Sequence, residues 1–116
     1  MLDLLIRGGT VVDGTGSAPY AADVAVENGR IVEVGTLPGA HARRIISADG
    51  KLVTPGFIDI HRHADAAAFR PGFGELELRQ GLTTIVSGNC GLSCAPVGPE
   101  NLPAILSYLE PICGRG

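Results

Sequence analysis

Two runs of alternating apolar and polar residues, 23–27 and 30–34, flank the dipeptide Asn28-Gly29. An Asn-Gly pair between such runs favours a type I′ turn, because both central residues of that turn need a positive φ angle. The sequence therefore predicts an antiparallel β-hairpin over 23–34. This is the clearest local signal in the chain, and it indicates that the first half is built from β-strands.

Other short β segments surround the hairpin. The apolar runs 3–7 and 10–13 are separated by two glycines, which predicts strands joined at a bulge or turn. Runs 43–47 and 51–54 predict a second strand pair. With 17 glycines and 8 prolines among 116 residues, turns are dense and helices short. Residues 1–54 are therefore interpreted as a small antiparallel unit of the β-sandwich type.

The pattern changes at Pro55. Residues 55–61 are apolar on both faces, which favours a buried parallel strand over a half-exposed one. The segments that follow are predicted as a helix over 75–80, a strand over 82–87 and a helix over 100–110. Alternation of strand and helix is typical of βα units. We therefore expect an α/β fold in which 55–116 form the first one or two βα units of a TIM-like barrel, incomplete within these residues.

Composition and charge exclude several classes of protein. The formal net charge is −3, so no basic surface for nucleic acid is expected. No stretch approaches the ~20 apolar residues of a membrane-spanning helix. The third residue, Asp3, is an acid where a secretory signal carries positive charge, and three cysteines are a poor disulfide framework. We therefore expect a cytoplasmic protein with no membrane or nucleic-acid partner.

Two histidines follow the predicted buried strand. His61 and His63 are spaced i and i+2, so their imidazoles face one space if the strand continues through them. This arrangement suits two ligands of one metal ion, although two polar loop histidines would give the same pattern. Asp59 and Asp65 add nearby oxygen donors, and they are candidate supporting residues that fix the histidine tautomers. Arg62 points the opposite way in a strand and is interpreted as structural.

A cysteine follows the next predicted strand. Cys90 lies in the motif Gly-Asn-Cys-Gly at 88–91, 29 positions after His61. Because a βαβ crossover takes ~30 residues, equivalent points on neighbouring parallel strands are expected at this separation. Cys90 would then emerge with the histidines at the C-terminal edge of the sheet, where α/β enzymes place their chemistry. A thiolate is a strong Zn²⁺ ligand, so His61, His63 and Cys90 are predicted metal ligands, with Asn89 as a supporting residue. A small buried core cysteine is the alternative.

Four segments carry a resemblance to a known family. Residues 3–16 are similar to that family's opening strands, and 55–65 are similar to a first barrel strand with its HxH metal pair. Residues 79–84 and 88–96, the latter containing Gly-Asn-Cys-Gly, are the narrower mark. Together they resemble the amidohydrolase superfamily, and more narrowly its N-acyl-D-amino-acid deacylase (D-aminoacylase) branch. The resemblance covers essentially the whole chain, as an N-terminal part of such an enzyme.

The resemblance implies a function. Its reaction is hydrolysis of the amide of an N-acyl-D-amino acid, a small-molecule substrate, with one or two zinc ions that activate water. By this resemblance His61 and His63 bind one metal and Cys90 binds or bridges. The general base belongs to later barrel segments, so no catalytic acid or base is expected within 1–116. We therefore expect the chain alone to be inactive, with an unpaired barrel edge through which it self-associates.

Two other functions remain open at this point. An amidohydrolase of another branch, such as a dihydroorotase- or hydantoinase-like enzyme that cleaves cyclic amides, would share the histidine pair but would not need Cys90. A non-catalytic β module that acts as an assembly unit would need none of these ligands.

Overall fold

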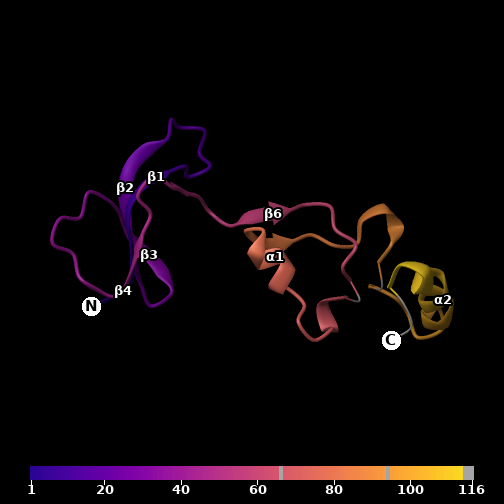
Figure 1. The fold of residues 1–116 in the computed structure, drawn as a ribbon. Coiled ribbons are helices and arrows are strands. Elements are labelled where there is room, and N and C mark those ends of the chain that lie inside the picture. The colour runs from indigo at the N-terminus through magenta and orange to yellow at the C-terminus, as the bar shows by residue number, and fades with distance from the viewer. Residues whose placement is uncertain (66, 94, 114–116) are drawn as a thin grey trace. The chain divides into compact units, whose positions relative to one another are not determined.

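The computed structural model describes residues 1–65, 67–93 and 95–113, and the chain divides into two compact units, Met1–Pro55 and Gly56–Gly116 (Figure 1). Each unit has its own sheet. The described part of the first unit is built from strands alone, whereas that of the second combines short strands with helices.

The first unit is a five-stranded mixed sheet within the described residues. Its strands are β1 (Leu2–Val11), β2 (Tyr20–Glu27), β3 (Arg30–Gly35), β4 (Ala42–Ser47) and β5 (Leu52–Val53). Strand β2 lies between β1 and β3 and is antiparallel to both. On its other side β1 pairs in parallel with β4 and β5. The β-rich character of this unit is therefore confirmed, but the described strands form one mixed sheet and not the predicted antiparallel unit of the β-sandwich type.

The turn between β2 and β3 confirms the predicted hairpin. Asn28 and Gly29 have φ angles of 52° and 71°, the positive values that a type I′ turn requires. The backbone N–H of Asn28 also donates a 2.6 Å hydrogen bond to Asp3 Oδ2, which ties the turn to β1.

The predicted strand pair at 43–47 and 51–54 is wrong, because these segments pair with β1 rather than with each other. A bulge divides β1, with a register shift between Ile6 and Gly9. Strand β4 pairs before the bulge and β5 pairs after it. A side chain at Gly9 would place its Cβ 2.5 Å from Val53 Cγ2, so glycine is what lets β5 approach the bulge.

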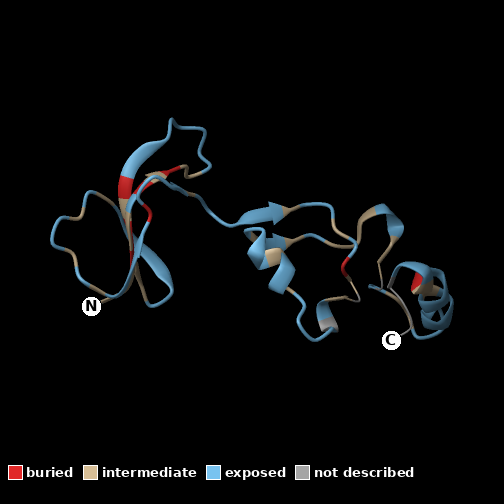
Figure 2. Cartoon of the chain, viewed as in Figure 1, coloured by how far each residue is buried: buried red, intermediate tan, exposed pale blue. Residues whose placement is uncertain are grey.

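The core of the first unit is small. A cluster of Val11, Ala22 and Val24 is buried, with Ile6 and Val53 packed against it. Large apolar side chains on the outer strands remain exposed; these include Ile31, Val32, Ile45 and Leu52. Most of the described chain is exposed or half-buried (Figure 2).

The second unit contains one βαβ crossover. Strand β6 (Phe57–Asp59) and strand β7 (Leu82–Ile85) pair in parallel, and helix α1 (Glu75–Arg79) lies between them in the sequence. The helix ends before Gly81, whose φ of 82° is the left-handed conformation expected of a glycine just after a helix. The predicted strand–helix–strand order is therefore confirmed for this segment.

Two short 3-10 turns and one longer helix follow in the described part of the second unit. The turns are η1 (Ala67–Phe69) and η2 (Asn89–Gly91), and the helix is α2 (Leu102–Cys113). Helix α2 begins two residues later than predicted and ends three residues later. No helix within the described residues has both the length and the apolar character needed to cross a bilayer.

Strand β6 differs from its prediction. It ends at Asp59 instead of continuing through the histidines, and Phe57 and Ile58 are 56% and 60% exposed rather than buried. In the described residues β7 is the one strand that pairs with β6. An apolar strand with a single neighbour keeps much of its surface in water, which explains the exposure.

Asp23 connects two irregular points of the first sheet. Its carboxylate accepts a 2.8 Å hydrogen bond from the Gly8 N–H at the bulge and a 3.1 Å bond from the Leu37 N–H after β3. The Gly8 bond, then the Leu37 bond and the nearby charge of Arg7, hold the pKa of Asp23 below its ordinary value.

We expect Asp23→Asn to destabilise the first unit near pH 7, because an amide offers one acceptor oxygen where the carboxylate uses two. Since the folded pKa of Asp23 is lowered, its stabilisation is complete above the unfolded pKa of about 3.9 and is lost as pH falls through the folded pKa. Denaturation followed by circular dichroism at several pH values checks this. The difference from wild type should shrink in acid, and a constant difference would contradict the assignment. The exposed Asp49→Asn variant controls for charge.

Candidate metal centre

The two histidines lie in the loop that follows β6. The His61 N–H donates a 3.1 Å hydrogen bond to Asp59 Oδ1, which bends the chain directly after the strand. The Arg62 N–H donates to the Val86 carbonyl at 3.1 Å, just beyond β7. The rings of His61 and His63 are 5.3 Å apart between centroids and stand at 81° to each other.

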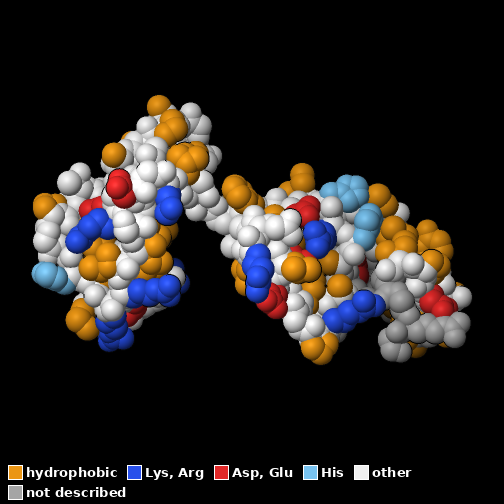
Figure 3. Space-filling view, in the orientation of Figure 1, with side chains coloured by type: hydrophobic (Ala, Val, Ile, Leu, Met, Phe, Trp, Pro, Cys, Tyr) orange, Lys and Arg blue, Asp and Glu red, His pale blue; other side chains and the backbone are white. Residues whose placement is uncertain are grey.

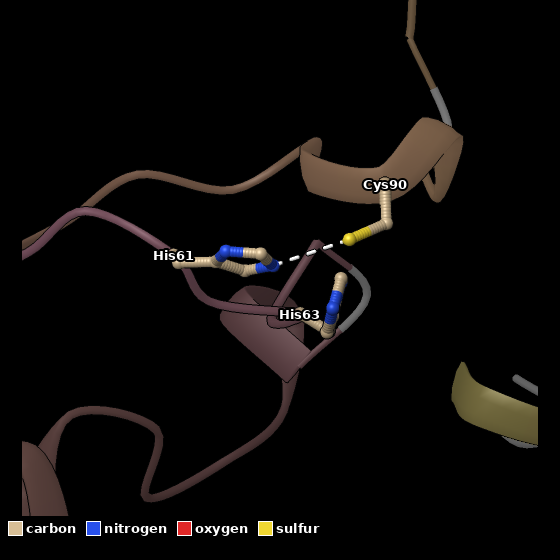
Figure 4. Close-up of side chains that lie close together, drawn as sticks. All are labelled: His61, His63 and Cys90. Atoms are coloured by element: carbon tan, nitrogen blue, oxygen red, sulfur yellow. Dashed lines mark hydrogen bonds between the residues drawn. The ribbon is translucent and has the colours of Figure 1, made fainter.

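Cys90 lies in the short turn η2 that follows β7. Its φ and ψ angles are 59° and 21°, a left-handed conformation that few non-glycine residues adopt. The side chain of the preceding residue, Asn89, donates a 2.9 Å hydrogen bond back to the Val86 carbonyl. The turn therefore folds back on the end of β7, and it aims the Cys90 sulfur at the histidine loop (Figure 4).

The three predicted ligands meet. His61 Nε2 lies 3.2 Å from Cys90 Sγ, and one ligand atom from each of His61, His63 and Cys90 lies within 4.8 Å of the others. All three side chains are exposed, and the histidines lie at the surface of the second unit (Figure 3). Two imidazoles and a thiolate form a donor set typical of zinc sites.

The route to this convergence differs from the sequence-based expectation. The histidines were predicted to align on a strand, but β6 ends at Asp59 and both lie in irregular backbone. They meet because the loop is held by hydrogen bonds at His61 and Arg62. The interpretation of Cys90 as a buried core residue is excluded by its exposure.

The predicted supporting residues contact the backbone of the site. Asp59 accepts from the His61 N–H, and Asp65 Oδ2 accepts from the Gly88 N–H at 3.3 Å. Asn89 binds the Val86 carbonyl, as described above. These contacts hold the backbone of the two loops. The sequence-based prediction was different, because it expected the carboxylates to fix the tautomers of the imidazoles.

Sequence reasoning missed Glu77. Its carboxylate accepts a 2.6 Å hydrogen bond from Arg62 Nη2, and Arg62 Nη1 lies 3.7 Å from Asp59 Oδ2. The interpretation of Arg62 as structural agrees with these contacts. The sequence holds no periodic signal that would pair two residues 15 positions apart across a loop and a helix.

No protein-family model matches the chain. An N-acyl-D-glutamate deacylase from Alcaligenes xylosoxydans xylosoxydans is 46% identical over 110 residues, which cover 93% of this chain and 22% of that protein. A solved D-aminoacylase, described as having a binuclear metal centre, matches with a TM-score of 0.80 at 45% identity. That match covers 94% of this chain and 23% of the D-aminoacylase. Over most of its length, the chain is therefore similar to D-aminoacylases and related deacylases.

A second solved structure adds chemical context to this homology. It is an N-acyl-D-glutamate deacylase from Bordetella bronchiseptica, complexed with zinc and a phosphonate that mimics the tetrahedral reaction intermediate. It matches with a TM-score of 0.78 at 42% identity, over 90% of this chain and 23% of that one. The chain thus spans less than a quarter of the length of the relatives it matches.

The left-handed backbone of Gly88, with φ of 82°, yields a prediction for this turn. Gly88→Ala should destabilise the second unit by about 1 kcal/mol or more, because a Cβ disfavours this conformation. Gly88→Asn should be milder, since asparagine tolerates it better. Thermal unfolding and the amide NMR signals around the turn measure both. Equal behaviour of the two variants would contradict a backbone origin.

Proposed function

We propose that this chain is the metal-binding part of a zinc-dependent N-acyl-D-amino-acid deacylase, and that His61, His63 and Cys90 hold the ion. The observation that carries the proposal is the convergence of these side chains from loops that follow neighbouring parallel strands. The homology supports it, because a related deacylase was solved with zinc.

The observed separations fit such an ion. Zinc bound tetrahedrally at about 2.0–2.1 Å from nitrogen and about 2.3 Å from sulfur separates its donor atoms by about 3.4–3.6 Å. The 3.2 Å between His61 Nε2 and Cys90 Sγ is close to this value. Because the three ligand atoms lie within 4.8 Å of one another, His63 needs only a small side-chain adjustment to reach the same ion. The exposure of all three side chains leaves other coordination positions accessible to water, substrate or further protein ligands.

The proposed reaction is hydrolysis of the amide of an N-acyl-D-amino acid to a carboxylate and a D-amino acid. When bound, zinc supplies a Lewis acid that polarises the acyl carbonyl and makes water nucleophilic near neutral pH. The chain's own contribution is to present three donors on two loops braced by Asp59, Asp65 and Asn89. A small-molecule substrate suits an exposed cluster on the surface of the unit.

We also propose that 55–116 form the beginning of a TIM-like barrel, with β6 and β7 as its first two parallel strands. A barrel of this type uses eight strands and about 250 residues, and it carries its chemistry at the C-terminal ends of the strands. The candidate ligands follow the C-terminal ends of β6 and β7. The general base is then expected from barrel segments beyond these 116 residues.

The two alternative functions explain fewer features of the site. A hydantoinase-like enzyme would need the histidine pair alone, whereas here Cys90 is held in a left-handed turn and contacts His61. A non-catalytic β module gives no reason for the three donors to meet. Metal-dependent deacylation, with Cys90 as a ligand beside the two histidines, is therefore the function that the site supports best.

Two further expectations stay predictions. One is the cytoplasmic setting, which rests on the cysteine content. The other is self-association through the edge of β6 that no described strand covers, where Phe57 and Ile58 are largely exposed.

We expect the 116-residue chain to bind zinc, and Cys90→Ala to weaken the binding by more than about tenfold because one of three ligands is lost. Affinity should fall as the pH is lowered, since imidazole and thiol ligands must lose protons to bind metal. Competition with a metal-indicating chelator measures both.

Two variants control this experiment. Cys90→Gly removes the sulfur without straining the left-handed backbone, so it should match Cys90→Ala if the thiol is the ligand. His41→Ala changes an exposed histidine in the other unit and should bind zinc like wild type. Zinc affinity that is unchanged in both Cys90 variants would refute the thiolate ligand.

We expect the purified 116-residue chain to leave N-acyl-D-methionine unhydrolysed even when loaded with zinc, because the general base lies elsewhere. Release of the free amino acid, followed by chromatography, tests this. Zinc-dependent turnover that is lost in His61→Ala would contradict the expectation, since contaminating enzyme would not respond to that variant.

A further inference from the structure

Arg62 lies between the two candidate histidine ligands and contacts three separate parts of the second unit. Its guanidinium Nη2 donates a 2.6 Å hydrogen bond to Glu77 Oε1 on α1, and its Nη1 lies 3.7 Å from Asp59 Oδ2 at the end of β6. Its backbone N–H donates to the Val86 carbonyl after β7. The histidine loop is therefore fixed through this single residue to a helix and two strand ends.

The backbone of Val86 joins the two ligand loops. Its N–H donates a 2.8 Å hydrogen bond to the Asp59 carbonyl, and its carbonyl accepts from both the Arg62 N–H and the Asn89 side chain. Asn89 directly precedes Cys90. A displacement of Arg62 would therefore shift the cysteine loop as well as the histidine loop.

The Arg62–Glu77 ion pair is better shielded from water than the Arg79–Glu75 ion pair, which also involves α1. Glu77 is 14% exposed and Arg62 37%, whereas the partners in the Arg79–Glu75 pair are 73% and 63% exposed. A charge-assisted hydrogen bond with a shielded acceptor holds its geometry, while an exposed pair on a helix surface contributes little. The two pairs on one helix therefore form a test site and its matched control.

We propose that Arg62 is a positioning residue for metal binding: through Glu77 and Asp59 it holds His61 and His63 in register with Cys90. This inference rests on the proposed function, because it assigns Arg62 a role toward the same ion. Arg62 is not itself a ligand. Arg62 orders both loops before the ion binds. The loops therefore lose less conformational entropy on binding.

Zinc titration of the 116-residue chain and its variants tests this role. Arg62→Ala should bind zinc about 10- to 100-fold more weakly, the usual effect of losing a group that orients metal ligands. Arg62→Lys should recover part of the affinity, since an ammonium keeps the charge but not the forked geometry. Glu77→Gln should weaken binding in the same direction. Arg79→Ala, which removes the exposed pair of the same helix, should bind like wild type.

Cobalt(II) gives a second readout that a loss of general stability would not change. In the folded, cobalt-loaded chain, the sulfur-to-cobalt charge-transfer absorption per bound ion should fall in Arg62→Ala and persist in Arg79→Ala, because the Cys90 sulfur no longer aligns with the histidines. If Arg62→Ala does not fold, Arg62→Lys and Glu77→Gln decide the question in its place.

The outcomes separate this inference from the proposed function. Wild-type chain that fails to bind zinc would refute the proposed function and, with it, the role of Arg62. Wild-type chain that binds zinc, with affinities and cobalt spectra unchanged in the Arg62 and Glu77 variants, would refute the positioning role alone.

Discussion

Backbone hydrogen bonds continue past the ends of the parallel strands β6 and β7, and the candidate metal centre depends on them. The Val86 N–H bonds to the Asp59 carbonyl, and the Arg62 N–H returns to the Val86 carbonyl. Ligands that are 29 residues apart in sequence would otherwise pay a loop-closure cost when they bind an ion. The hydrogen bonds beyond the strand ends close this loop during folding. The donor atoms therefore lie close together before a metal ion binds.

Features that depend on local backbone chemistry could be predicted from the sequence. Asn28-Gly29 specified its turn because few other residues adopt positive φ, and Gly81 ended α1 for the same reason. The meeting of His61 with Cys90 was also predictable, because the length of a βαβ crossover relates sequence separation to position on a sheet. The first rule is a local backbone preference, and the second is the regular length of a crossover between neighbouring parallel strands.

Features that depend on the choice of a distant partner could not be predicted. Strands β4 and β5 both pair with β1 rather than with each other, and the bulge at Gly9 separates these two successive parallel partners. The burial of β6 was predicted wrongly because burial depends on what covers a strand and not on its own residues. The Arg62–Glu77 contact likewise joins residues that no periodic pattern relates.

The left-handed backbone of Cys90 limits which amino acids can replace its sulfur. Asparagine, aspartate and histidine adopt this conformation far more readily than other non-glycine residues, whereas β-branched side chains are excluded by steric clash. An aspartate at this position would offer oxygen in place of sulfur while the main chain kept its course, and oxygen donors favour harder ions such as Mn²⁺ or Mg²⁺. The shape of one turn thus leaves open a change of metal preference by a single replacement, without remodelling of the loop.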